Sequence, residues 1–192
     1  MIPRSYVVAA ASLALLACGG GDKTTGPNNT GASGSVSFSF SGGTSGNFNA
    51  SGAINSTTSA DFSRAWAAGV KDASAGTVEI AATTPKAGST HDLVTMIIPR
   101  TTTGSSTIVS SCSGQNCAAI AVLFGSQING SGFSFICDVE SGTITIASIS
   151  NTKVTGSFSG TGHCFTSAGA QSNFTVTNGS FDVPLVTGVP TT

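Results

Sequence analysis

The residues of this chain that could do chemistry are few, chiefly five cysteines and two histidines. Four of the cysteines lie in the second half of the chain, and Cys18 stands alone near its start. An imidazole beside a carboxylate can serve a nucleophile as a general base, and thiols with imidazoles can hold zinc. The spacing of these residues therefore has to decide between nucleophilic, metal and purely structural roles.

Cys18 follows the residues Leu15-Leu16-Ala17, which end an apolar run from Tyr6 that begins after Arg4. A membrane-spanning helix needs about 20 apolar residues, so this run has the length of a secretory signal instead. A small residue directly before the cysteine resembles a bacterial lipobox. The resemblance implies that residues 1–17 are a lipoprotein signal peptide, and that Cys18 is acylated on its sulfur and its new amine. The alternative is an ordinary secretory signal with Cys18 unmodified.

Two or more acyl chains hold a protein stably on a bilayer, so an acylated Cys18 would anchor this chain in the cell envelope. The residue after it is Gly19 and not the aspartate that favours inner-membrane retention, which points to the outer membrane. Residues 18–34 continue as a polar, glycine-rich stretch with Pro27 and no apolar residue larger than Ala32. A coil of this kind reaches about 20–25 Å and predicts a flexible tether.

The remaining cysteines are even in number, and an exported chain favours two disulfides over free thiols. Three pairings are possible. We favour Cys112–Cys117 with Cys137–Cys164, because the first pair can close a small loop and strand parity places the second pair on one face. The alternative is a zinc site that uses these thiols with His163; an oxidising compartment disfavours it.

The histidines allow a lipid-anchored hydrolase that uses His91, next to Asp92, or His163. The chain contains no G-x-S-x-G or S-x-x-K motif, so His91 is interpreted as a polar residue at a strand edge. Asp138 and Glu140 lie two apart, a spacing that calcium sites and glycoside-cleaving pairs also use. We interpret them as a solvated turn before Ser141.

The composition predicts an all-β fold. The chain has 30 Ser, 26 Thr and 25 Gly with only 8% charged residues, so it lacks the residues that favour helices. From residue 35 apolar and polar residues alternate, which predicts about ten short strands in one antiparallel β-sandwich or open barrel over 35–192. Trp66 lies between alanines in such a stretch and is interpreted as a core residue, not a sugar-stacking platform.

Two local features stand out in the C-terminal third. Ile144 and Ile146 share one parity while Ile149 has the other, which predicts a β-bulge near Ala147. The dipeptide Asn178-Gly179 lies between Phe174-Thr-Val and Phe181-Asp-Val, which predicts a hairpin with a type I′ turn.

The strings Val154-Thr-Gly-Ser-Phe-Ser-Gly and Val176-Thr-Asn-Gly-Ser-Phe-Asp-Val resemble the ending of a family of uncharacterised bacterial lipoprotein domains. The likeness covers the last 50 residues or so well and residues 45–130 loosely. It implies an all-β domain and transfers no functional residue and no activity.

These observations favour a non-enzymatic envelope lipoprotein that binds another envelope protein, a glycan or a small ligand. The hydrolase is the alternative, and assembly through an uncapped edge strand is a third possibility. The net charge of −1 and the absence of a basic patch exclude nucleic acid as an expected partner. No cofactor is expected.

The disulfide prediction is tested by alkylation of the purified protein before reduction. Two disulfides leave none of the last four cysteines reactive, and intact mass then shows no added alkyl group on them. Four alkylated thiols would contradict the prediction and revive the zinc site.

Overall fold

A computed structural model describes residues 31–54, 61–110, 117–127 and 132–186. The signal peptide, Cys18 and most of the tether lie outside these ranges. The described residues form ten strands and no helix, so the all-β prediction is confirmed. The strands are β1 (Ser33–Gly42), β2 (Gly46–Ala53), β3 (Trp66–Asp72), β4 (Thr77–Lys86), β5 (Thr90–Ile98), β6 (Gly104–Val109), β7 (Ala119–Gln127), β8 (Phe135–Ile149), β9 (Lys153–Thr166) and β10 (Gln171–Pro184). Within the described part of the chain, nothing forms a helix able to cross a membrane.

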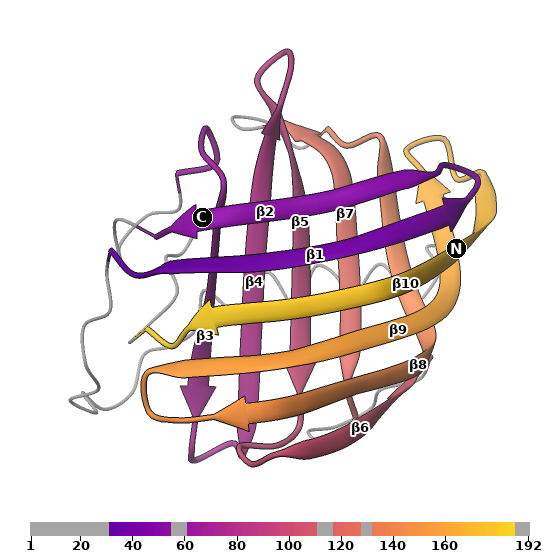
Figure 1. The fold of residues 1–192 in the computed structure, drawn as a ribbon. Coiled ribbons are helices and arrows are strands. Elements are labelled where there is room, and N and C mark those ends of the chain that lie inside the picture. Colours follow the sequence, from indigo (N-terminus) through magenta and orange to yellow (C-terminus); the bar gives the residue numbers. More distant parts are fainter. Residues whose placement is uncertain (1–30, 55–60, 111–116, 128–131, 187–192) are drawn as a thin grey trace.

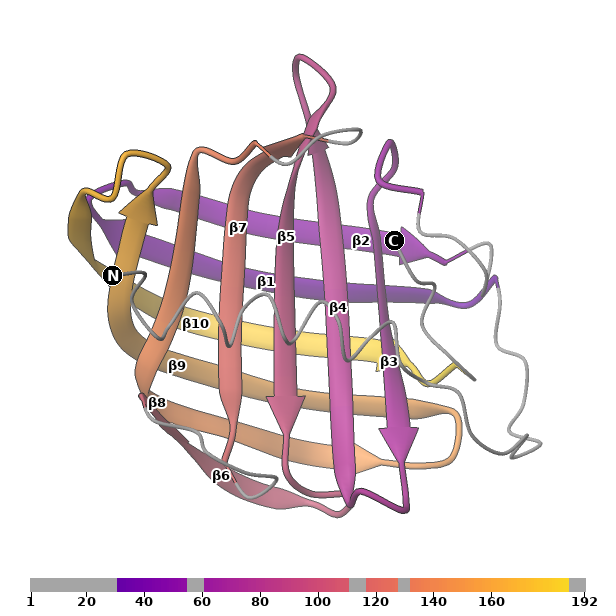
Figure 2. The ribbon, with the colours of Figure 1, turned by 180° about the vertical axis from the view of Figure 1, so that it is seen from behind.

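All ten strands belong to one antiparallel sheet in the order β2-β1-β10-β9-β8-β7-β5-β4-β3, with β6 beside β8. The sheet folds over itself into two layers. Strands β3, β4, β5 and β7 form one layer, and β2, β1 and β10 cross it on the other side (Figures 1 and 2). Long strands β8 and β9 bend from one layer into the other (Figure 2). The result is a nearly closed, barrel-like sheet.

The edge strand β3 is joined to the residues that directly follow β10. Gly69 of β3 forms a parallel bridge with Leu185, and the N–H of Val186 donates to the Gly69 carbonyl oxygen over 2.8 Å. These contacts tie the last residues of β10 to the far edge strand, so the layers cannot separate without breaking them.

Aromatic side chains from both layers fill the interior. Phe38 of β1 stacks on Phe48 at 5.0 Å between ring centroids and meets the edge of Phe158 at 5.6 Å. Phe40 crosses from the same strand to Phe124 of β7, with ring centroids 4.7 Å apart. These rings join the apolar alternate residues of nearly every strand into a single buried core. Burial of this apolar surface is the main driving force for the fold.

The bulge predicted near Ala147 is confirmed. In the β8–β9 pair the register shifts between Ile146 and Ser148, which leaves Ala147 without an opposing residue. An extra residue reverses the parity of everything after it. Ile144 and Ile146 therefore stay buried in the core while the strand still reaches the Ser150–Lys153 turn in register with β9.

The hairpin predicted at Asn178-Gly179 is wrong. Strand β10 runs straight through these residues as a two-against-one bulge opposite β9, and Asn178 has a φ of 53°. A two-residue turn and a bulge both favour asparagine at positive φ, and both bring Val176 and Phe181 to the same face. Long-range pairing decides between them, because β1 and β9 flank β10 on both sides of the bulge.

Two further differences concern the second half of the chain. The alternation around Cys137 and that around Ile144 predict two separate short strands, but both stretches belong to the single strand β8, which bulges at Glu140. Strand β6 was not predicted, although Ser106 and Ile108 point inward with a period of two. Its short length and its polar neighbours hid that pattern.

Gly34 lies where β1 crosses β3 most closely. A Cβ atom at this position would fall against the Ala67 carbonyl oxygen of β3 and the Pro184 side chain, closer than side chains approach in real proteins. The backbone of Gly34 is not in the left-handed region, so the requirement for glycine here is close approach alone.

Replacement of Gly34 by alanine should therefore lower the free energy of unfolding by about 2–3 kcal/mol, because the crossing must open. Gly88→Ala is the matched control: its site has a φ of 75° but open space around the Cβ position, so its cost is about 1 kcal/mol. Urea unfolding of both variants measures the difference. Equal losses would contradict the role of the crossing.

Candidate functional site

The predicted disulfide between Cys137 and Cys164 is present. These residues face each other in the β8–β9 pair with Cα atoms 3.9 Å apart, and both are buried in the core. The strand parity that predicted the pairing is therefore confirmed. The bond cross-links the two strands that bend between the layers, so its role is structural.

The other predicted pairing has one of its two cysteines among the described residues. Cys117 is disulfide-bonded, while Cys112 lies outside the described residues, so their pairing stays a prediction. Within the described ranges no three histidine, cysteine or carboxylate side chains gather in a way that could hold a metal ion.

The structure brings together His163 with both carboxylates that the sequence singled out. Asp138 lies directly opposite His163 in the β8–β9 register, and Glu140 is the bulged residue just beyond. Nδ1 of His163 lies 3.0 Å from a Glu140 carboxylate oxygen, with about a third of each side chain exposed. The interpretation of Asp138 and Glu140 as a solvated turn is therefore wrong: the bulge in a continuous strand, not a turn, separates them.

Asp138 is the unusual member of this cluster. Burial, and then the nearby charge of Glu140, raise the pKa of its carboxyl from 3.8 to about 6. Its other register neighbour is Ala121 of β7, which supplies no charge. A carboxyl group with this pKa beside an imidazole–carboxylate pair can exchange protons near neutral pH.

His91 and Asp92 are neighbours in β5, but their side chains contact different partners. Asp92 accepts a hydrogen bond from the Gly125 N–H at 3.0 Å and pairs with Lys86 at 3.1 Å, holding the irregular β5–β7 pairing. His91 instead stacks on Phe62 with ring centroids 4.4 Å apart and is only 4% exposed. Burial lowers the pKa of His91, and the charge of Asp92 opposes this shift without cancelling it. Because the pKa stays below its usual value, the imidazole is mostly neutral at pH 7. His91 lies next to the start of β5, where it is interpreted as a polar residue at a strand edge, but its side chain is buried.

Trp66 is a core residue, as predicted. It is 2% exposed and packs with Ile54, Ala68 and Val186 in a small cluster on the outer side of β3 and β4. Within the described part of the chain its indole Nε1 and the Nδ1 atom of His91 are buried without a hydrogen-bond partner.

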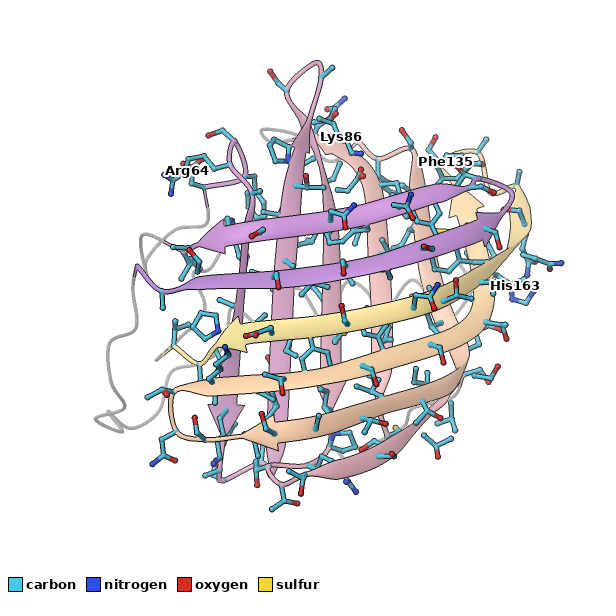
Figure 3. All side chains as sticks on the ribbon, in the orientation of Figure 1. Arg64, Lys86, Phe135 and His163 are labelled. Atoms are coloured by element: carbon cyan, nitrogen blue, oxygen red, sulfur yellow. A yellow bond between two sulfur atoms is a disulfide. The ribbon has the colours of Figure 1, made fainter. Side chains whose placement is uncertain are left out.

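Sequence reasoning missed a polar surface that extends over six strands of the described part of the chain. Outward positions in the central parts of β2, β1, β10, β9, β8 and β6 carry serine, threonine and asparagine, and we call this surface the hydroxyl face. Towards the strand ends the outward positions carry other residues, among them Asp138, His163 and Asp182. In Figure 3 its short, oxygen-tipped side chains stand on the strands nearest the viewer. Its members are Asn47, Asn49, Ser51, Ser35, Ser37, Ser39, Ser41, Thr175, Thr177, Ser180, Thr155, Ser157, Ser159, Thr161, Ser141, Thr143, Thr145, Ser105 and Thr107.

Strand register aligns these residues in rows across the sheet. One row runs without interruption through Asn49, Ser37, Ser180, Ser157, Thr145 and Ser105, one residue from each of six strands. Ser39 Oγ donates a hydrogen bond to Oδ1 of Asn47 on the neighbouring strand over 2.8 Å. Among the described residues, four hydroxyl–hydroxyl bonds also join neighbouring strands on the face or, for Ser148, beside it. They are Ser37–Ser180 (3.0 Å), Ser105–Thr145 (2.9 Å), Ser141–Thr161 (2.9 Å) and Ser148–Thr155 (2.7 Å).

Charge is confined to the margins of the hydroxyl face. Asp182 and Lys153 form an ion pair of 2.8 Å at the end of β9 and β10 near the β8–β9 turn. His163 lies at the opposite end (Figure 3). The sequence signal for this face was the serine at every second position from Ser35 to Ser41, but only the register shows that six strands share it.

No family model, curated protein or solved structure matches this chain.

Asp138→Asn should stabilise the protein above pH 6 and leave it unchanged near pH 3. The raised pKa means that the folded state keeps a proton that the unfolded state has lost, so stability falls as pH rises from about 4 to about 6. The amide removes that loss, about 1–2 kcal/mol at pH 7. Thermal unfolding across this pH range measures it.

Asp72→Asn serves as a control of opposite sign. Hydrogen bonds from Ser74, then Ala75, lower the pKa of Asp72, so its contribution to stability is present at neutral pH and is lost on acidification. An Asp138→Asn variant that loses stability at pH 7 would contradict the assignment of a desolvated carboxyl.

Proposed function

We propose that this protein is a lipid-anchored, non-enzymatic binding protein of the cell envelope, held at the outer membrane by acylated Cys18. The observation that carries the proposal is the sequence Leu15-Leu16-Ala17-Cys18 followed by a polar tether. An anchor and a spacer suit a domain that must meet a partner close to a membrane.

The fold supports a binding role on the outside of the barrel. Phenylalanine rings occupy the interior between the layers, so a partner would meet the outer surfaces of the sheet. The hydroxyl face, which extends over six strands, is one such outer surface.

The alternative is a lipid-anchored hydrolase. The bond between His163 and Glu140 favours it, since a carboxylate can orient an imidazole for acid–base work. A nucleophile would also be required. Thr161, two residues away on the same strand, bonds to Ser141 instead, and His91 lies beneath Phe62. Binding is therefore the function that the geometry supports better.

Cys18→Ala tests the anchor. The wild-type protein should sediment with membranes and require detergent for release, whereas the variant should appear in the soluble fraction, because acylation needs the thiol. Gly19→Ser is the matched control, which keeps the cysteine and should stay membrane-bound. A Cys18→Ala variant that remains in the membrane fraction would overturn the proposal.

A further inference from the structure

The hydroxyl face differs from an ordinary solvated sheet surface in its charge. Protein surfaces usually carry about a quarter to a third charged residues, which keep them soluble. Across the central parts of six strands this face presents hydroxyl and amide side chains, and the charged groups among the described residues of these strands stand at its two ends. They are the pair Asp182–Lys153 at one end, and His163 with Glu140 and Asp138 at the other. Solvation alone does not require such a composition.

We propose that the hydroxyl face docks a neutral, hydroxyl-rich polysaccharide. The inference rests on the proposed function, for which it names the class of partner. It concerns the central rows of the face, such as the row of Ser37, Ser180 and Ser157, in which each residue lies directly opposite the next in strand register.

Charge complementarity selects an uncharged partner. A polyanion or polycation lying on this surface would leave its charges without counter-charges while losing part of its hydration, which is unfavourable. An apolar partner would strip water from the hydroxyls without replacing their hydrogen bonds. A sugar polymer offers donors and acceptors of the same kind as the water that it displaces.

The geometry of the face suits an extended polymer. Rows are spaced by two residues along each strand, roughly 6.5–7 Å, and neighbouring hydroxyls within a row by about 4.8 Å. Bonds such as Ser37–Ser180 and Ser105–Thr145 hold these short side chains in place, so little rotamer freedom remains to be lost on binding. Each paired hydroxyl still has acceptor capacity, and one of each pair keeps a free donor direction.

Affinity should come from many weak contacts together. Each hydrogen bond to a sugar replaces one to water and adds little alone. Several copies tethered on one membrane can engage the same polymer, so binding should be strong to a polysaccharide surface and weak to a short sugar.

The test uses the full-length lipidated protein in phosphatidylcholine vesicles, sedimented with microcrystalline cellulose or chitin as neutral probes and with insoluble pectate as a charged one. We expect co-sedimentation with a neutral probe and not with pectate. The double variant S37A/S157A should weaken it at least about fivefold, since each lost hydrogen bond is worth a factor of about two to ten. Absence of wild-type binding to both neutral probes, or equal binding to pectate, would overturn the proposal.

The matched control is T102A/S167A, which removes two exposed hydroxyls outside the face and should leave binding unchanged. A second face variant, T143A/S159A, from the neighbouring row, should repeat the loss, and thermal unfolding confirms that each variant is folded. If the control loses binding as the face variants do, the assignment to this face fails. Attachment of the same protein preparations to vesicles, measured without polysaccharide, tests the lipid anchor separately from polysaccharide binding.

Discussion

The structure depends on one constraint: a single sheet of ten strands must turn back on itself so that β2 and β1 at one end cross β3 at the other (Figure 1). Gly34 lets β1 lie against β3 at that crossing, and the bridge between Gly69 and Leu185 ties the far edge to the end of β10. Closure brings phenylalanine rings from both layers together inside. It also turns the polar alternate residues of β1, β2, β9 and β10 outward, which determines the composition of that surface.

Closure requires bent strands, and bulges provide the bends. The one at Ala147 could be predicted, because three isoleucines close together in sequence reveal the change of parity. The one at Asn178 could not be distinguished from a turn, since both satisfy the same local pattern. Only the pairing of β10 with β1 and β9, which are distant in sequence, excludes the hairpin. Local alternation of apolar and polar residues was thus enough to predict strands, but not how those strands pair and connect.

In the candidate site, too, local sequence patterns predicted some features, and others depend on contacts between distant parts of the chain. Parity placed Cys137 opposite Cys164 correctly, because both residues lie in regular stretches. The spacing of Asp138 and Glu140 suggested a turn, since nothing in the sequence shows that a bulge interrupts a strand there. His91 becomes buried through Phe62, a residue from another part of the chain. The hydroxyl face, in turn, is a property of register across six strands that composition alone hints at and cannot locate.

Many of the serine and threonine residues of this chain, which has few charged residues, lie on the hydroxyl face. The most direct measurement is amide NMR of the lipidated protein in nanodiscs, titrated with the neutral tetrasaccharide cellotetraose. The account predicts weak shifts, at millimolar sugar, confined to the outward rows of β1, β10 and β9. Shifts concentrated at β4, β5 and β7, around His163, or nowhere at saturating sugar would contradict it.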